Sequence, residues 1–600
     1  MRTHASLALA SLCLPGALAN FLAPTYPPPK DLSGSDSAVA AGWRNLTTRL
    51  ERSLHTRSNT TLSNLRDLTF SIGLFSPHDS GASDLQYHYT APEVRNATNG
   101  TNKVDADSIY RVASVSKLFT VLAGLVELDA ADWERPLSEL SPTLAESLRE
   151  SSGTVDPIYD TQWDAITPSA LAAQLSGVSH YGQPWTEDLI LGYAGAIAAN
   201  VTVPTVYDPA TYGLPTVDLT DPTILSPCSN LEGTCSPEGY YEGVASNPPI
   251  FLPWASPAYS NNGLTLLGLA ISNLTGKSLQ QVYQDAIFDP LGLDSSYSQY
   301  PPQSESSRFV VGGALEEGFA LDNGLSTPSG GIYSTLNDLT KFGIGILNST
   351  LLTPLQTRRW MKPLTHSASL HYSSGAPWEI YRYTDPKSGI VTDIYTKLGD
   401  AGYYGAISAF LPDFDVGFSV LGASSDDHRS GWTLELIQAI VDTLLPALNK
   451  QAAKELDEKY AGTYTSTDAN LNSTITFASA GTPAAPGLVI TNWISNGTDL
   501  SPRLPGLLSN DVDKTYRLRP AIVSSDKIAF RAATPPSNPP PRPGDNSKLI
   551  TDLYDVNDWL LVDGQTYANR ALAEFVFDLG DDGSVEGVTP AAWRVRLEKE

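Results

Sequence analysis

The segment RVASVSKLFTVLAGLVEL, residues 111–128, places Ser114 and Lys117 three positions apart at the start of a strongly apolar run. The apolar side chains leave almost no polar face, which predicts a helix buried on most sides: Val115, Leu118, Phe119, Val121, Leu122, Leu125 and Val126. Residues i and i+3 share one face of a helix, so we expect Lys117 to project beside Ser114 near the helix N-terminus. Such a lysine is either a surface residue near a helix start or the base that activates a serine nucleophile.

A serine hydroxyl becomes a good nucleophile only when a neighbouring base removes its proton. To act as that base, Lys117 must be uncharged, which requires its pKa to fall by about three units from ~10.4. The helix dipole contributes only ~0.3–1 kcal/mol, less than one pKa unit, whereas burial can lower a lysine pKa by about 3–5 units. Desolvation must therefore dominate. The sequence contains neither a G-x-S-x-G elbow nor an H-E-x-x-H motif, which argues against a histidine-activated serine and against a zinc hydrolase.

An S-x-x-K pair is weak evidence alone, because a chain of this length contains roughly one or two by chance. Ser524 and Lys527 form another such pair, in a region that reads as β-structure. Two later motifs distinguish the first pair. Tyr259-Ser260-Asn261 lies in WASPAYSNNGLTLLGLA, a polar turn that leads into an apolar helix. Lys397-Leu398-Gly399 lies in TKLGDAGYYGAISAFLP, a strand-like run with glycines where a substrate backbone can approach.

These motifs, in this order, resemble the S-x-x-K, Y-x-N and [KH]-x-G motifs of the serine β-lactamase/penicillin-binding-protein superfamily, in its class C β-lactamase-like branch. ITPSALAAQLSGVSHYG (166–182) is similar to the LLTHTSG segment of that branch, and PSGGIYSTLNDLTKF (328–342) to its GGLxSTxxDLxKF helix entry. The resemblance implies an α+β fold: a β-lactamase/transpeptidase-like domain in which an antiparallel sheet is flanked by a mostly helical subdomain. It implies no cofactor.

The resemblance also implies a catalytic set of six residues: Ser114, Lys117, Tyr259, Asn261, Lys397 and Gly399. Ser114 would be the acylated nucleophile, and Lys117 would accept its proton. Tyr259 would pass protons to the leaving group and help to activate the deacylating water, because a separate glutamate of the class A kind is missing between the first two motifs. Asn261 would orient the substrate and the lysine, and Lys397 would keep the pKa of Tyr259 low.

The third motif has two implied roles, in the oxyanion hole and in binding a substrate carboxylate, and this sequence departs from the family in the second role. A backbone N–H just after Gly399 would complete an oxyanion hole with the N–H of Ser114, where loss of one donor costs ~2.7–4 kcal/mol. The family usually has Thr or Ser between the lysine and the glycine, and that hydroxyl helps to hold a substrate carboxylate. Leu398 cannot do so, and Asp400 is expected to add negative charge beside it. The sequence therefore favours an ester or amide substrate over a β-lactam.

The chain divides into parts of different composition. LALASLCLPGALA followed by Asn20 is typical of a secretory signal with an A-x-A cleavage site. Short alternating runs such as STITFAS and AEFVFDLG predict an all-β sandwich or barrel at the C-terminal end, which resembles the lipocalin-like appendage of related fungal extracellular proteins. We predict a signal peptide, an N-terminal arm, a serine hydrolase domain with an irregular Pro- and Tyr-rich insertion, and an all-β domain: 1–19, 20–65, 66–455 (insertion 200–256) and 456–600.

Other features predict a secreted, extracellular glycoprotein. Cys228 and Cys235 suit a small disulfide loop in an oxidising compartment, and a metal site is disfavoured because no histidine partners lie nearby. The formal charge of −27 argues against nucleic acid as a partner, and no run is long enough for a transmembrane segment. Nine sequons are candidate glycosylation sites: Asn45, Asn59, Asn96, Asn99, Asn200, Asn273, Asn348, Asn472 and Asn496.

The leading hypothesis is a secreted serine hydrolase that acts on a small acyl substrate, as an esterase, an amidase, a D-peptidase or a weak β-lactamase. One alternative is an acyltransferase that passes the acyl group to an alcohol or amine, with the 200–256 insertion excluding water. A second alternative is a non-catalytic binding protein. The natural substrate and the oligomeric state stay open at this level.

Overall fold

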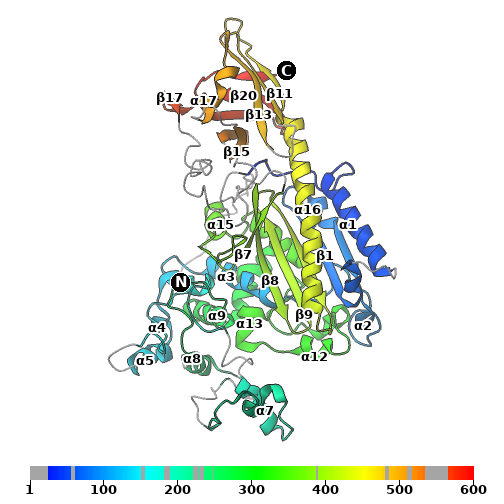
Figure 1. Ribbon diagram of the computed structural model, residues 1–600, viewed down its shortest axis with the longest axis vertical. Helices are drawn as coiled ribbons and strands as arrows, with labels where there is room; N and C mark the ends of the chain where they lie inside the picture. The colour runs from blue at the N-terminus through cyan, green and yellow to red at the C-terminus, as the bar shows by residue number, and fades with distance from the viewer. Residues whose placement is uncertain are drawn as a thin grey trace, which may run out of the picture.

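The strand-like run at 396–412 forms part of an eight-stranded antiparallel sheet (Figure 1). The same sheet contains segments of LTFSIGLFS (68–76) and LQYHYTAP (85–92), whose sequences also favour strands. The strand order is β2-β1-β10-β9-β8-β7-β6-β5, so β1, near the start of the chain, pairs with β10, where Phe70 lies opposite Gly422. The strands are β1 (Thr69–Phe75), β2 (Gln86–Tyr89), β5 (Thr365–His366), β6 (Tyr372–Ser374), β7 (Glu379–Thr384), β8 (Val391–Ala401), β9 (Tyr404–Leu411) and β10 (Val416–Ala423).

The computed structural model describes most of the chain, namely residues 24–55, 61–150, 156–180, 189–220, 228, 235–245, 247–386, 390–479, 486–509, 516–533 and 565–600. Two predicted features lie outside the described residues: the signal peptide and the sequon at Asn59.

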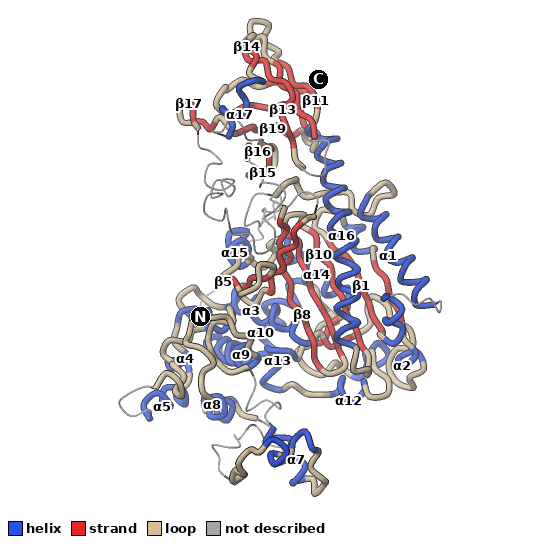
Figure 2. The backbone as a smooth tube through the Cα atoms, viewed as in Figure 1, coloured by secondary structure: helices blue, strands red, loops and turns tan. Residues whose placement is uncertain are grey.

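One face of the sheet is covered by the long helix α16 (Arg429–Tyr460) and by α1 (Ala38–His55), which lie side by side (Figures 1 and 2). The predicted N-terminal arm thus contains a helix that the sequence analysis did not anticipate. Its buried residues Val39, Trp43, Leu46, Leu50 and Leu54 recur at helical spacing and form a single apolar stripe. That stripe belongs to a core shared with α16 and with the alternate side chains of the central strands.

The opposite face of the sheet carries the helical subdomain, whose core includes the predicted apolar helix α3. All residues of α3 from Ser116 to Gly124 are buried, as the sequence pattern predicts, whereas Val126 near the C-terminal end of the helix is 36% exposed. Helix α3 spans Ser116–Glu127 and packs against α9, α10 and α13. The helices described on this side of the chain are α4 (Leu137–Leu140), α5 (Pro142–Glu150), α6 (Pro168–Ala172), α8 (Pro237–Ala245), α9 (Asn261–Thr275), α10 (Leu279–Tyr283), α11 (Asp289–Leu291), α12 (Leu315–Ala320), α13 (Thr327–Gly330), α14 (Leu336–Leu347) and α15 (Pro354–Trp360). A short pair, β3 (Tyr110–Arg111) and β4 (Tyr333–Ser334), precedes α3 and α14. Among the described helices, none combines the length and the apolar character needed to cross a membrane.

The insertion between residues 200 and 256 joins the helical subdomain at two places. Its N-terminal neighbour α7 (Leu189–Ala198) lies away from the central sheet in Figure 1, whereas α8 packs against the subdomain core. The last part of the insertion runs beside residues 174–177, because the N–H groups of Ile250 and Trp254 donate to the carbonyls of Gly177 and Leu175 at 2.8 and 2.7 Å.

The C-terminal region is all-β, as predicted. Its strands form a closed ring in the order β12-β11-β21-β20-β19-β16-β15-β13, which is closed by pairing of β12 with β13. The bounds are β11 (Gly462–Thr465), β12 (Thr474–Ser479), β13 (Leu488–Ser495), β14 (Thr498–Asp499), β15 (Arg517–Val523), β16 (Lys527–Ala533), β17 (Thr566–Tyr567), β18 (Arg570–Ala571), β19 (Glu574–Leu579), β20 (Val585–Pro590) and β21 (Leu597–Lys599), with α17 at Leu504–Ser509. Buried aromatic rings, including Phe477, Phe530 and Phe577, pack against one another in its core. The likeness to lipocalins and the domain boundary near residue 455 stay predictions.

Candidate active site

Ser114 lies in a tight 3₁₀ turn, Ala113–Val115, immediately before α3. Ala113 is buried and has φ of 47°, a left-handed conformation that is uncommon for a residue with a side chain. The hydroxyl of Ser116 holds the turn: it donates to the carbonyl of Ala113 at 2.6 Å and accepts the N–H of Ile332 at 3.0 Å. This arrangement leaves Ser114 half-buried, while Lys117, one turn further on, has no exposed surface.

The hydroxyl oxygen of Ser114 contacts two titratable groups at once. Lys117 Nζ lies 3.0 Å from Ser114 Oγ, and the hydroxyl of Tyr259 donates to the same oxygen at 2.8 Å. Lys117 Nζ also donates to Asn261 Oδ1 at 2.7 Å and to the carbonyl of Ser329, on α13, at 2.5 Å. The three motifs that lie far apart in sequence therefore meet at one hydroxyl group.

The surroundings of Lys117 suit an uncharged amine. Burial lowers the pKa of Lys117 to about 8, and the charge of Lys397 lowers it further, while Tyr259 opposes the shift. A neutral amine has two N–H groups and one lone pair, and the site offers two acceptors besides the serine: Asn261 Oδ1 and the carbonyl of Ser329. With both N–H groups directed there, the lone pair is left facing Ser114 Oγ. The amine can therefore accept the serine proton.

Tyr259 lies between two lysines. Lys117 Nζ is 4.8 Å and Lys397 Nζ is 5.0 Å from the centre of its ring. Burial favours the neutral phenol, but the charge of Lys117 in its protonated form and the charge of Lys397 outweigh it and lower the pKa of Tyr259 below its ordinary value. A phenol with a lowered pKa exchanges protons more readily near neutral pH. The geometry thus matches the proton-relay role that the resemblance implies.

Gln174 holds the backbone on both sides of Tyr259. Its side-chain oxygen accepts the N–H of Ser260 at 2.6 Å, and its carbonyl accepts the N–H of Ala258 at 2.9 Å. Gln174 has φ of 60°, so its backbone turns sharply here. The segment 166–182, which the sequence analysis matched to a family segment without assigning it a task, therefore positions the tyrosine.

His180 is a site neighbour that the sequence analysis did not single out. Its ring centre lies 5.0 Å from that of Tyr259, and its Nε2 is 3.4 Å from Asn261 Nδ2. Burial, together with the charge of Lys117, lowers the pKa of His180 to about 4, so the imidazole is neutral and its Nε2 can accept from the asparagine amide. This contact leaves Asn261 Oδ1 directed at Lys117. The available signal in the sequence was a histidine three residues after Gly177, but this spacing does not reveal which residue the histidine contacts.

Lys397 is fully buried and forms an ion pair with Glu379 of β7, a residue that the sequence analysis missed. Burial disfavours the ammonium group, but Glu379 more than compensates and raises the pKa of Lys397. Lys397 Nζ also donates to the carbonyl of Leu398 at 2.7 Å, and the second oxygen of Glu379 accepts the N–H of Leu398 at 2.8 Å. These contacts thus fix the position of the Lys397 ammonium group beside Tyr259 and keep it charged.

The expectation for Asp400 is wrong. Its carboxylate pairs with Arg429 at the start of α16 instead of facing Lys397. Side chains alternate along a strand, so positions 397 and 400 of β8 point to opposite faces of the sheet. The side chain of Leu398 packs against the core that contains α16, which agrees with the expectation that it cannot hold a substrate carboxylate. The carboxylate that stands beside Lys397 belongs to Glu379.

Gly399 lies where β8 passes closest to the nucleophile turn. A Cβ at this position would be 2.3 Å from the carbonyl oxygen of Val112 and 3.2 Å from the backbone nitrogen of Ser114. Because Leu398 N points away from β9 toward Glu379, alternation directs the N–H of Asp400 to the same open edge of β8. The edge N–H and that of Ser114 are the two donors expected for an oxyanion hole.

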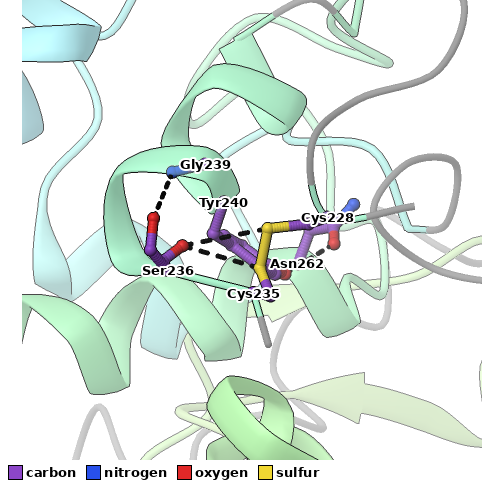
Figure 3. The surroundings of a disulfide bond; sticks show 6 residues. All are labelled: Cys228, Cys235, Ser236, Gly239, Tyr240 and Asn262. Carbon is purple, nitrogen blue, oxygen red and sulfur yellow. Dashed lines mark hydrogen bonds between the residues drawn. A yellow bond between two sulfur atoms is a disulfide. The ribbon is translucent and has the colours of Figure 1, made fainter. Parts of the chain in front are cut away.

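The disulfide predicted between Cys228 and Cys235 is present (Figure 3). It adjoins the start of α8, where the hydroxyl of Ser236 accepts the N–H of Gly239 at 3.1 Å. On α8, the buried hydroxyl of Tyr240 donates to Asn262 Oδ1 at 2.8 Å. Asn262 follows Asn261 directly, so the cross-linked part of the insertion is anchored to the helix that carries a site residue.

All six predicted catalytic residues thus come together around Ser114, whereas Ser524 and Lys527 lie exposed at the turn between β15 and β16. Each described sequon asparagine has an exposed side chain: Asn45, Asn96, Asn99, Asn200, Asn273, Asn348, Asn472 and Asn496. Their glycosylation stays a prediction.

The chain is similar to known proteins in both of its regions. A family profile described as "Beta-lactamase" matches residues 82–439, and one described as "Beta-lactamase-like-like, C-terminal domain" matches residues 452–600. The chain is 29% identical over 499 residues to "Beta-lactamase-like protein" of Arthroderma benhamiae, covering 81% of this chain and 75% of that protein. It is 25% identical over 561 residues to "Probable hydrolase clz13" of Cochliobolus lunatus, covering 87% and 84%. A solved "Beta-lactamase/D-alanine Carboxypeptidase from Yersinia pestis complexed with citrate" is 16% identical, covers 68% of this chain and 99% of its own, and has a TM-score of 0.46.

Proposed function

Since the chain belongs to the beta-lactamase family, we propose that it is a serine hydrolase that forms an acyl-enzyme on Ser114. The observation that carries this proposal is the double contact of Ser114 Oγ with Lys117 Nζ at 3.0 Å and with the Tyr259 hydroxyl at 2.8 Å. A nucleophile within hydrogen-bond reach of a base, which is itself oriented by further groups, is the arrangement that nucleophilic catalysis requires.

In the acylation step, Ser114 Oγ attacks the carbonyl carbon of an ester or amide while its proton passes to Lys117 Nζ. The backbone N–H groups of Ser114 and Asp400 hold the negative oxygen of the tetrahedral intermediate. The bond to the leaving group then breaks, and Tyr259 donates a proton to the leaving group. Lys117 then passes the proton that it took from Ser114 to Tyr259. In deacylation, Tyr259 takes a proton from the attacking water as it passes its own proton to the neutral Lys117. Lys117 then gives that proton to Ser114 Oγ as the bond between Oγ and the acyl carbon breaks, which releases Ser114 and the carboxylic acid product.

The substrate class proposed is a small ester or amide. Leu398 packs away from the site, so the hydroxyl that commonly helps to hold a carboxylate in this family has no counterpart there. A true β-lactamase activity is therefore the least favoured of the hydrolytic possibilities.

The test is the Ser114→Ala variant, assayed on a panel of nitrophenyl esters and with a fluorophosphonate probe that acylates or phosphonylates active serines. We expect loss of labelling and of turnover by at least about 10³-fold, because no other group can form the covalent intermediate. Ser524→Ala, in the exposed S-x-x-K pair, is the matched control and should keep full activity. Labelling that persists in Ser114→Ala would refute the proposal, and an unlabelled wild type would favour the binding-protein alternative.

The same assay distinguishes a hydrolase from an acyltransferase. With an alcohol or amine acceptor added, a hydrolase yields the free acid as its main product, whereas an acyltransferase yields the transferred ester or amide. We propose hydrolysis as the main reaction, because Ser114 is half-buried in the described chain and not sealed from water.

We also propose that the protein is secreted. The disulfide and the exposed positions of the described sequon asparagines support an oxidising, glycosylating route. Mass measurement of the protein from culture medium, before and after glycosidase treatment, tests this proposal; an unglycosylated chain retained in cells would contradict it.

A further inference from the structure

The side-chain nitrogens of both lysines beside Ser114 are already occupied by protein acceptors, whether Lys117 is charged or neutral. Lys117 Nζ is directed at Ser114 Oγ, Asn261 Oδ1 and the carbonyl of Ser329. An ammonium group has three N–H donors, so this set leaves none for a substrate. Lys117 can therefore act in proton transfer, but it cannot also bind an anionic group of the substrate.

Lys397 is occupied in the same way. Its donors reach Glu379 Oε1 and the carbonyl of Leu398, and its third direction is toward Tyr259. Lys397 is only 1% exposed, whereas its partner Glu379 is 15% exposed. At the open edge of β8, the group that a substrate approaches is thus the carboxylate and not the ammonium.

The second oxygen of Glu379 also occupies an edge N–H of β8. It accepts the N–H of Leu398, which lies two residues before the expected oxyanion donor at Asp400. The described carboxylates on β8 pair elsewhere, Asp393 with Arg382 and Asp400 with Arg429, and neither pairs with Lys397. Glu379 is therefore the carboxylate on this side of the nucleophile that an incoming anion would meet.

We propose that Glu379 is a specificity-determining residue that excludes substrates with a carboxylate on the leaving group and restricts the site to uncharged or cationic esters, thioesters and amides. The Glu379 carboxylate and a carboxylate on the leaving group would repel each other strongly in this partly desolvated site. Such repulsion is an effective way to discriminate against an unwanted substrate. The inference rests on the proposed function, since it describes which acyl donors reach Ser114.

Three thioesters with the same phenylacetyl group test the proposal. Their leaving groups are thioglycolate (anionic), thioglycolamide (neutral) and thiocholine (cationic). In each case the acyl group moves from sulfur to Ser114 Oγ, the C–S bond breaks, the released thiolate is measured with a thiol reagent, and water then frees phenylacetate. Wild type should use the amide at least about tenfold better, by kcat/KM, than the thioglycolate, and the thiocholine ester at least as well as the amide.

The variant Glu379→Gln should narrow the amide-to-thioglycolate ratio to within about threefold, because it removes the repelling charge and frees Lys397 to meet an anion. The matched control is Asp393→Asn, which removes a carboxylate on the same strand, four residues from Lys397 and paired with Arg382, and it should keep the wild-type ratio. Equal use of the three thioesters by wild type, or an unchanged ratio in Glu379→Gln, would overturn the inference. If wild type cleaves none of the three, the proposed function itself fails. If Glu379→Gln does not fold, the wild-type order across the three charges still decides.

Discussion

A single methyl group at Gly399 should disable the site without removing any catalytic side chain. In Gly399→Ala, the new Cβ would lie 2.3 Å from the carbonyl oxygen of Val112, whereas ordinary contacts begin at 3.4 Å. The new Cβ would thus be about 1 Å too close. The carbonyl oxygen belongs to the backbone and the Cβ is bonded directly to the backbone, so neither atom can move away by rotating a side chain. Strand β8 and the nucleophile turn must therefore move apart by about 1 Å.

A displacement of this size acts directly on catalysis. It carries the edge N–H after residue 399 away from the N–H of Ser114, and a misplacement of about 1 Å can reduce a rate by ~10²-fold. Weakening one oxyanion donor gives a loss of the same order, ~2.7 kcal/mol or more. We expect kcat for a nitrophenyl ester to fall about 100-fold while KM changes little, because the oxyanion forms only in the transition state.

The assay is steady-state hydrolysis combined with thermal unfolding. Overpacking should lower the free energy of unfolding by about 1–3 kcal/mol, which leaves the variant folded at 25 °C. Gly431→Ala, in α16, is the control: nothing lies within 4 Å of its Cβ, and activity should stay at the wild-type level. A Gly399→Ala enzyme within threefold of wild-type kcat would refute the close approach of β8 and with it the proposed oxyanion hole.

Two further predictions concern protonation. The neutral form of Lys117 is the active base, and its pKa is lowered to about 8, so kcat/KM should rise with pH and reach half its maximum near pH 8. Below that pH, kcat/KM should fall about tenfold per pH unit. In Tyr259→Phe the residual activity should rise at lower pH, because the charge of Tyr259 that raises the pKa of Lys117 is lost. A flat profile between pH 6 and 9 would contradict the assignment. At the turn between β9 and β10, burial, aided by Asp393 and opposed by Arg519 of the C-terminal ring, raises the pKa of Asp413 to about 7. The folded state then holds a proton that the unfolded chain loses near pH 4, so stability falls as pH rises from about 4 to 7. Asp413→Asn should remove this loss and gain about 2–3 kcal/mol more at pH 8 than at pH 5 in urea unfolding, because about two pH units at ~1.36 kcal/mol each lie between pH 5 and that pKa; an equal gain at both pH values would contradict it.

Local patterns of the sequence were sufficient for several elements. The apolar run after Ser114 requires a buried helix because no face of it is polar, and the alternating runs near residues 70 and 410 require strands. Other elements escaped this reasoning, among them α1, β7 and β20. The Pro-rich stretch that precedes α1 led to the prediction of an arm, so the apolar stripe of this helix was not recognised. Strand β20, with the sequence VEGVTP, contains too few large apolar residues to show an alternating pattern.

Within the site, the sequence determined the residue types and their order, and the tertiary structure decided their partners. The i, i+3 spacing alone brings Lys117 to Ser114, because a helical turn fixes that contact. The two acceptors that direct the lysine lone pair come from α9 and α13, and only packing of these helices against α3 supplies them. Likewise, the register of β7 on β8, with Glu379 opposite Thr396, gives Lys397 its carboxylate, while the alternation of β8 sends Asp400 to Arg429. Strand register is set by the pairing of whole strands and by which faces are buried, so no spacing along the chain could reveal which acid neutralises the lysine.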